Sequence, residues 1–217
     1  MKKIVKSVGS STYEHIKHDI IFGELQPGKK LKLEALKEQY GASVSMLRET
    51  LSRLASEGFV SAEEQRGFFV APVSKEDLLE IAKLRILIES HALKDSIENG
   101  DAEWEGSLVA AGHKLSLMEE RMQAGDLSEK ETWKRYDWEF HKAMIQACNS
   151  KNLISLHSII FDKYLRYQML VLTFRGKEAA IEHKNMLNAA LERNTARAQK
   201  ILKQHILGGL KHSMSAF

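Results

Sequence analysis

The sequence has few of the residues that mark secreted, fibrous or membrane proteins. Its 217 residues include one cysteine and two prolines, and 7% are aromatic. The single Cys148 excludes an internal disulfide and is typical of a reducing cytoplasm, where we expect the protein. No apolar run is long enough to span a bilayer, so we expect no membrane segment. Residues 1–11 lack the apolar core and cleavage site of a secretion signal.

The composition is that of an ordinary globular chain, with 43% hydrophobic and 28% charged residues. A net charge of +3 is too small to indicate nucleic-acid binding by itself. The charge is uneven, however, because residues 1–32 contain seven lysines against Glu14, Asp19 and Glu24. Such a basic segment permits contact with phosphates, although lysine-rich segments are more often simply solvated.

Apolar residues at helical spacing predict three helices in the first part of the chain, over 13–23, 31–40 and about 44–56. Pro27 and Gly28 break the first, and Gly58 follows the third. Two extended segments, 59–62 and 67–71, flank a polar tip and predict a β-hairpin. Three helices followed by a hairpin are typical of a winged helix-turn-helix.

The rest of the sequence predicts only helices. The first begins near Ser74, with Leu78, Ile81, Leu84, Ile88 and Leu93 as its apolar stripe. Further helices are expected at about 101–124, 128–148, 151–173, 177–192 and 195–213. We therefore expect a mainly α fold, with a winged helix-turn-helix domain at 1–73 and an all-helical bundle at 74–217.

A helix-turn-helix presents the first turns of its second helix to the major groove, and its wing reaches the adjacent backbone or minor groove. The expected DNA-contacting residues are Ser43, Ser45, Met46 and Arg48 at the helix start, and Arg66 and Gly67 at the wing tip. Ser43 or Ser45 also caps this helix. The alternative for Arg48 is a surface ion pair with Glu49 or Glu57.

Four segments carry a resemblance to GntR-type transcription regulators: Leu25-Gln-Pro-Gly28, Leu47-Arg-Glu49, Glu57-Gly58 and Gly67-Phe-Phe-Val70. The resemblance implies a DNA-binding regulator that acts as a homodimer on a roughly palindromic double-stranded operator. Arg48 matches the DNA-contacting arginine that the family retains. The chain departs from the family at Val44-Ser-Met46, where arginine, a small residue and proline are usual, and at Glu34, which replaces a frequent arginine. The family's operator sequences therefore do not transfer to this chain.

Four side chains in the helical part have the types and spacing of a metal site. Asp137 and His141 lie one helical turn apart, and His183 and His205 are each 11 residues from Asn194. If a turn at Asn194 joins two antiparallel helices, both histidines lie at the same height. The set suits zinc, nickel or another divalent transition metal. The alternatives are an ion pair of Asp137 with Lys134 or Arg135, and a metal-free hydrogen-bond network.

A second resemblance covers residues 75–213, which look like the FCD effector domain of FadR-type regulators. It rests on Asp137-x-x-Phe140-His141, Asn149, Glu182-His183 and His205. It implies that the aspartate and three histidines bind a divalent metal that helps to hold a small carboxylate effector. Arg85 and Glu89 match the family's Arg-x-x-x-Glu, and we add Arg166 and Tyr167 as further effector-binding candidates. The alternative for Arg85 is a helix-surface pair with Glu89.

Further likenesses, at Tyr40, Asp101-x-Glu-Trp-Glu105, His113 and Ser128-Glu-Lys130, resemble the carbon-starvation-induced repressor group and suggest a short dicarboxylate. We therefore expect a ligand-responsive repressor rather than an enzyme. One competing hypothesis is a metal-dependent hydrolase, in which the metal activates water and Glu182 is the available base. Another is a metal-free sensor, in which the same pocket uses the four polar residues only as a hydrogen-bond network.

Overall fold

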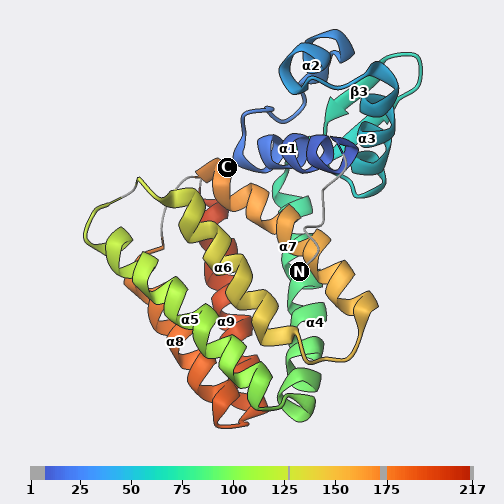
Figure 1. Cartoon of the computed structure of the whole chain (residues 1–217). Helices are drawn as coiled ribbons and strands as arrows, with labels where there is room; N and C mark the ends of the chain where they lie inside the picture. Colours follow the sequence, from blue (N-terminus) through green and yellow to red (C-terminus); the bar gives the residue numbers. More distant parts are fainter. Residues whose placement is uncertain (1–7, 127, 172–174, 216–217) are drawn as a thin grey trace. The chain divides into compact units, whose positions relative to one another are not determined.

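The structure is a computed structural model that describes residues 8–126, 128–171 and 175–215 (Figure 1). Contacts divide the described residues into two compact units. The first unit comprises the described residues of Met1–Lys75 and Leu165–Val171. The second unit comprises the described residues of Glu76–Tyr164 and Leu172–Phe217. The predicted fold class, mainly α with a winged helix-turn-helix before a helical bundle, is confirmed. No helix in the described ranges is both long and apolar enough to cross a membrane.

The first unit is built around α3 (Val44–Ser56), against which α1 (Val8–Phe22) and α2 (Leu33–Tyr40) pack. Its core contains the residues that helical spacing predicts, and Ile16, Ile20, Leu47, Leu51 and Leu54 are fully buried. Ser43 begins α3 as predicted, because its side chain accepts a hydrogen bond of 3.2 Å from the backbone N–H of Met46.

The wing is a three-stranded antiparallel sheet in the order β1-β3-β2. The predicted hairpin is present as β2 (Val60–Glu63) and β3 (Gly67–Val70). The additional strand β1 (Lys30–Leu31) was not predicted, and the helix expected from residue 31 begins at Leu33. Gly28, at a φ of 74°, turns the chain so that residues 28 and 29 hydrogen-bond to Val70. A two-residue strand is too short for a period-2 pattern, so only this pairing defines it.

The second unit contains α5 (Ala102–Gln123), α6 (Lys130–Ile145), α8 (Lys177–Leu191) and α9 (Thr195–Met214), with most of α4 (Lys75–Asn99) and α7 (Lys151–Val171). α5 packs against α6 and α8, and α8 packs against α9 (Figure 1). All six helices were predicted, with ends that differ by a few residues. The predicted extension of α7 to 173 lies outside the described residues.

The buried face of α4 departs from the predicted apolar stripe in the middle of the helix. Leu78, Ile81 and Leu93 are buried as expected, but Leu84 is 44% exposed and Ile88 is only partly buried. The buried face instead continues through Arg85 and Glu89, each 1% exposed. The apolar pattern was misleading here because two charged residues occupy core positions.

Candidate functional site

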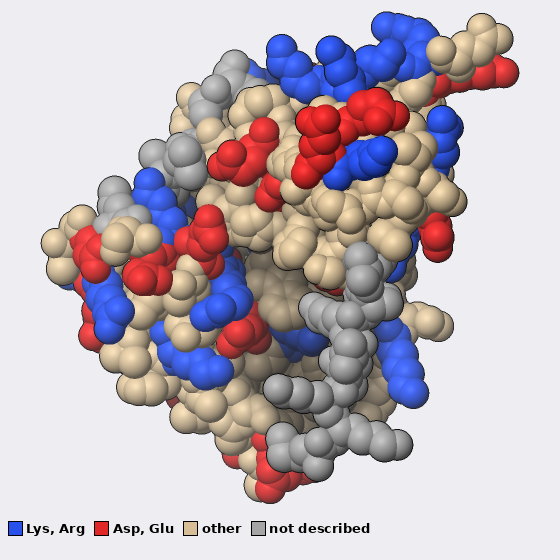
Figure 2. All heavy atoms as spheres, turned by 45° about the horizontal axis from the view of Figure 1, so that its top comes forward, with Lys and Arg blue, Asp and Glu red and all other residues tan. Residues whose placement is uncertain are grey.

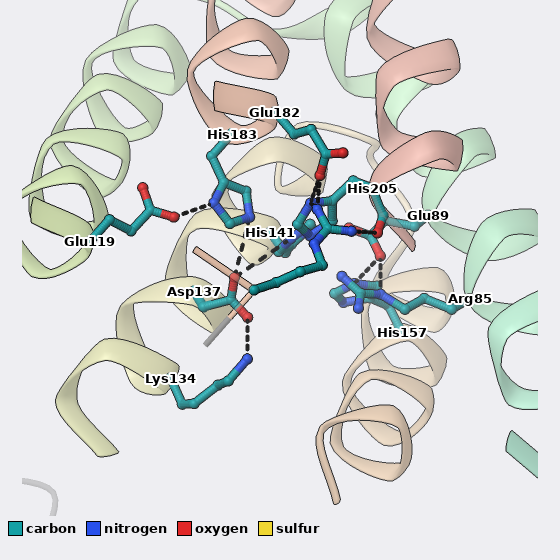
Figure 3. Close-up of polar contacts among 11 residues, drawn as sticks. Arg85, Glu89, Glu119, Lys134, Asp137, His141, His157, Glu182, His183 and His205 are labelled. Carbon is teal, nitrogen blue, oxygen red and sulfur yellow. Dashed lines mark hydrogen bonds and ion pairs between the residues drawn. The ribbon is translucent and has the colours of Figure 1, made fainter. Parts of the chain in front are cut away.

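Asp137, His141, His183 and His205 converge inside the second unit (Figure 3). Asp137 and His141 come from α6, His183 from α8 and His205 from α9. One potential ligand atom from each residue lies within 4.8 Å of the others, and all four side chains are buried. The structure thus brings together the four residues that the sequence selected; their role as metal ligands stays a prediction.

The turn between α8 and α9 places two of these histidines beside each other. Arg193 takes a positive φ of 56°, and the Asn194 side chain caps α9 by accepting a 3.1 Å hydrogen bond from the N–H of Arg197. The two helices then pack against each other. As a result, the ring centroids of His183 and His205 are 4.4 Å apart.

Each of the three histidines has a carboxylate at its Nδ1 atom. Glu89 bonds to His141, Glu119 to His183 at 2.6 Å and Glu182 to His205 at 2.9 Å (Figure 3). A carboxylate accepts hydrogen bonds, so these contacts favour a proton on Nδ1 and a lone pair on Nε2.

The opposite ring nitrogens of His183 and His141 lie near Asp137. Nε2 of His183 lies 3.3 Å and Nε2 of His141 lies 4.0 Å from Oδ1 of Asp137. Both nitrogens are buried and neither has a hydrogen-bond partner. Buried polar atoms without partners are costly, and a carboxylate behind each imidazole is the usual outer shell of a histidine metal ligand. The donor set therefore fits a metal ion.

The protonation states also suit metal binding. Burial lowers the pKa of His205 well below its ordinary value, and the neighbouring His183 and His141 lower it further. Burial likewise lowers the pKa of His141, although Glu89 opposes the shift. Burial would raise the pKa of Asp137, but Lys134 and the histidines outweigh it and lower that pKa. Neutral imidazoles and an ionised carboxylate are the forms that bind metals.

Arg85 and Glu89 form a buried ion pair rather than the alternative pair on the helix surface. Nε of Arg85 lies 2.8 Å from Oε2 of Glu89. Because Glu89 also bonds to His141, one carboxylate connects Arg85 to the cluster. The Arg85 guanidinium lies 4.3 Å and 4.9 Å from the ring centroids of Phe161 and Tyr164. Its Nη2 atom is buried without a hydrogen-bond partner, so it can donate to an acceptor from outside the chain.

Two more cations adjoin the cluster. Nζ of the buried Lys134 lies 3.7 Å from Oδ2 of Asp137, so this ion pair exists alongside the cluster. Arg175 donates to Glu182 and, at 2.9 Å, to the backbone oxygen of His205. Since Glu182 is held by both Arg175 and His205, it is not a free base for a hydrolase.

The remaining effector candidates contact the segment that follows β3. The guanidinium of Arg166 donates to the backbone oxygen of Ala71, and the hydroxyl of Tyr167 accepts a 3.1 Å hydrogen bond from the N–H of Ser74. All four of these residues belong to the first unit. Effector binding by Arg166 and Tyr167 stays a prediction that these contacts do not support.

A cavity of about 460 Å³ lies between α5 and α8, and its lining includes Phe140 from α6. Glu119 and His183 are among its lining residues, so it borders the cluster. Neither Arg85 nor Glu89 lines it.

The expected DNA-contacting residues lie on the first unit in different environments. Arg48 and Ser45 are exposed, whereas Met46 is partly buried and accepts a long contact of 3.9 Å from the Thr12 hydroxyl. Glu57 bonds to Tyr13, Lys17 and Arg53 rather than to Arg48. At the wing tip, Gly67 has a φ of 93°, and Arg66 pairs with Glu63 while remaining 71% exposed.

Sequence reasoning missed Glu119 and Arg175, and the only role that it gave to the Glu182 side chain was that of a base. A signal for Glu119 was present, because it continues the buried face of α5 that contains Leu115, Met118 and Met122. A charged residue at a core position of a helix indicates a buried partner. No comparable pattern marks Arg175, since it lies just outside a helix.

A winged helix-turn-helix joined to an all-helical unit is an architecture of DNA-binding regulators. Comparison with known families agrees: residues 9–70 match the bacterial regulatory proteins of the gntR family, and residues 80–208 match the FCD domain. The chain belongs to the GntR family and carries an FCD domain. Both matches fall within the predicted domains 1–73 and 74–217, whose boundaries stay a prediction.

Similar proteins are transcription regulators rather than enzymes. The regulator BphR of Paraburkholderia xenovorans (strain LB400) is 35% identical, over 93% of this chain and 83% of its own. The transcriptional repressor GlaR of Escherichia coli (strain K12) is 34% identical, over 90% of each chain. Among solved structures, E. coli McbR/YncC has a TM-score of 0.80 at 22% identity, covering 97% of this chain and 98% of that one. The metal-free FCD domain of TM0439 has a TM-score of 0.55 at 19% identity, covering 67% and 96%.

Proposed function

We propose that this regulator is a repressor whose helical domain binds a divalent transition metal and, with its help, a small carboxylate effector. The observation that carries the proposal is the arrangement of the three histidines. Each has a carboxylate at Nδ1, and two of them direct an unpartnered Nε2 toward Asp137. Hydrogen bonding alone would leave those buried nitrogens unsatisfied.

Zinc or nickel suits this set of three imidazoles and one carboxylate. The local charge also favours a cation. Around the cluster are four carboxylates, Glu89, Glu119, Asp137 and Glu182, but three cations, Arg85, Lys134 and Arg175. With neutral histidines the group has one excess negative charge, and a divalent ion would change it to one excess positive charge. Anion binding should therefore depend on the metal.

Arg85 is the residue that we expect to hold the effector. Its free Nη2 donor suits a carboxylate, and its pairing with Glu89 leaves the guanidinium fixed in orientation. A short dicarboxylate is the preferred candidate, because Lys134 and Arg175 add positive charge beside the cluster for a second acidic group. Since Glu89 contacts both Arg85 and His141, effector and metal would bind cooperatively.

We further expect a cytoplasmic homodimer on a roughly palindromic operator, since a bacterial DNA-binding regulator acts where the chromosome is. Leu84 and Leu87 on α4 are 44% and 68% exposed, and an apolar surface of this kind fits a second copy of the chain. Repression is suggested by the name of the similar GlaR.

The test uses full-length protein stripped with a chelator. Thermal unfolding is measured with zinc, nickel or no metal, each against a panel of mono- and dicarboxylates, and bound metal is quantified by elemental analysis. We expect one metal ion per chain and a carboxylate-dependent rise in the unfolding midpoint only in the metal-loaded protein. A rise of equal size without metal would instead support the metal-free sensor.

A further inference from the structure

The outer face of the wing sheet has two cations beside one aromatic ring. Lys30 of β1 pairs with Phe69 of β3, and cross-strand partners lie on the same face of a sheet. Nζ of Lys30 lies 5.8 Å from the centroid of the Phe69 ring, and Cζ of Arg66 lies 5.4 Å from it. These distances are within reach of cation–π attraction, which holds both side chains over the ring.

Two further lysines extend this basic surface along the chain. Leu31 is 5% exposed and points into the core, so Lys30 and Lys32 on either side of it point outward. Lys29, Lys30 and Lys32 are all exposed, and none has a carboxylate partner among residues 8–126, 128–171 and 175–215. Figure 2 shows lysine and arginine side chains gathered along one edge of the first unit. We call Lys29, Lys30 and Lys32 the β1 lysines.

The start of α3 is poor in positive charge by comparison. Arg48 is the one lysine or arginine between Ser43 and Ser52, and Arg53 is engaged by Glu57 and by the ring of Tyr13. Duplex DNA carries one negative charge per about 1.7 Å of its axis, and neutralisation of several phosphates supplies much of a regulator's affinity. A reading helix with one exposed cation in its first turns therefore requires phosphate contacts from another part of the unit.

We propose that the β1 lysines bind the sugar-phosphate backbone of the operator beside the bases that α3 reads. Phe69 is a positioning residue in this arrangement, because its ring restricts Lys30 to the outer face of the sheet. The contacts are to phosphates and not to base edges, since three neighbouring ammonium groups on flexible chains attract charge without a fixed hydrogen-bonding pattern. This proposal does not depend on the metal site.

The experiment uses the full-length protein and a duplex that the wild-type protein selects from a random pool. Its affinity for that duplex and for one unrelated duplex is measured over a series of salt concentrations. Each phosphate contact contributes about 0.9 to the slope of log affinity against log salt. Lys30→Ala should make the slope shallower by about 1, and Lys30→Ala with Lys32→Ala by about 2, equally for both duplexes. Lys30→Arg should retain the wild-type slope.

Lys94→Ala is the matched control, because this exposed lysine pairs with Glu98 on α4 and should leave the slope unchanged. Circular dichroism confirms that the variants fold. A double variant with the wild-type slope would overturn the proposal, and the lysines would then be merely solvated. A loss confined to the selected duplex would also overturn it, because the lysines would then contact bases.

Discussion

The two units of this protein place their charged residues in opposite locations. In the described residues up to Lys75, the buried polar side chains are Thr12 and Thr50, and the core is otherwise apolar. Among its described residues, the second unit buries nine acidic, basic or histidine side chains: Arg85, Glu89, Glu119, Lys134, Asp137, His141, His157, His183 and His205. The first unit thus keeps its charges on the surface, where DNA can meet them, with the buried Arg166 as an exception, whereas the second keeps many of its charges inside.

The difference agrees with the partners that we propose for the two units. An apolar core stabilises a small domain and leaves its surface free to contact a large anionic partner. Buried charges contribute little to stability unless they are fully paired, because desolvation opposes their attraction. A unit that retains so many of them, with unpartnered atoms on Arg85, His141 and His183, is suited to a small ligand that completes the set.

The largest effect is expected from His183→Ala. Removing a ligand should weaken metal binding more than the ~10–100-fold typical of an outer-shell residue, because a direct bond is lost. Competition with a chelator measures the affinity. His91→Ala, which removes a histidine that is 63% exposed, is the control and should bind metal normally. DNA affinity without effector should change little in either variant; a large loss in His183→Ala would show that the two units do not act separately.

A smaller loss of metal affinity is expected from Glu119→Gln. Glu119 is buried and accepts the hydrogen bond from Nδ1 of His183, so the amide would orient the ring less firmly and make it a weaker ligand. We expect metal affinity to fall by about 10–100-fold. Glu120→Gln is the matched control, since Glu120 is the adjacent exposed residue. Equal affinities for the two variants would exclude an outer-shell role for Glu119.

For the first unit, Arg48→Ala should weaken operator binding by roughly 1–3 kcal/mol and make its salt dependence shallower. The reason is the loss of the exposed cation at the start of α3. Electrophoretic mobility shifts at several salt concentrations measure both quantities, and metal content serves as the internal control. Unchanged affinity would remove Arg48 from the interface.

The smallest effect is expected for the pH dependence of the thermal stability of the metal-free protein. Burial lowers the pKa of both His205 and His141 below their ordinary value of 6.5. Below pH 6.5 the unfolded chain therefore binds protons that the folded chain does not. The free energy of unfolding consequently decreases as the pH is lowered.

All three tryptophans, Trp104, Trp133 and Trp138, lie in the second unit, so thermal unfolding followed by their fluorescence reports on that unit. We expect a falling midpoint from about pH 7 to about pH 5, and a weaker fall in His205→Gln. A constant midpoint in the wild-type protein would contradict the neutral, buried state of these histidines.

Local patterns predicted most of the fold because the elements are long and their ends are marked. Ser43 and Gly58 bound α3, and helical spacing identified Leu47, Leu51 and Leu54 as core. The failures have physical reasons. β1 consists of two residues held by long-range pairing with β3, and the buried face of α4 follows Arg85 and Glu89 instead of Leu84. Hydrophobic periodicity cannot identify a core position that a charged residue occupies.

The sequence by itself determined the order of the elements apart from β1, and it selected the four residues of the cluster. Helical spacing relates Asp137 to His141, and the position of a turn relates His183 to His205. Only the tertiary structure decided which carboxylate bonds to each histidine, since Glu89 and His141, like Glu119 and His183, lie on helices far from each other in sequence. It alone also showed that the Arg85 pair is buried and that Lys30 shares a sheet face with Phe69. Those relationships depend on packing between distant segments, which no local pattern specifies.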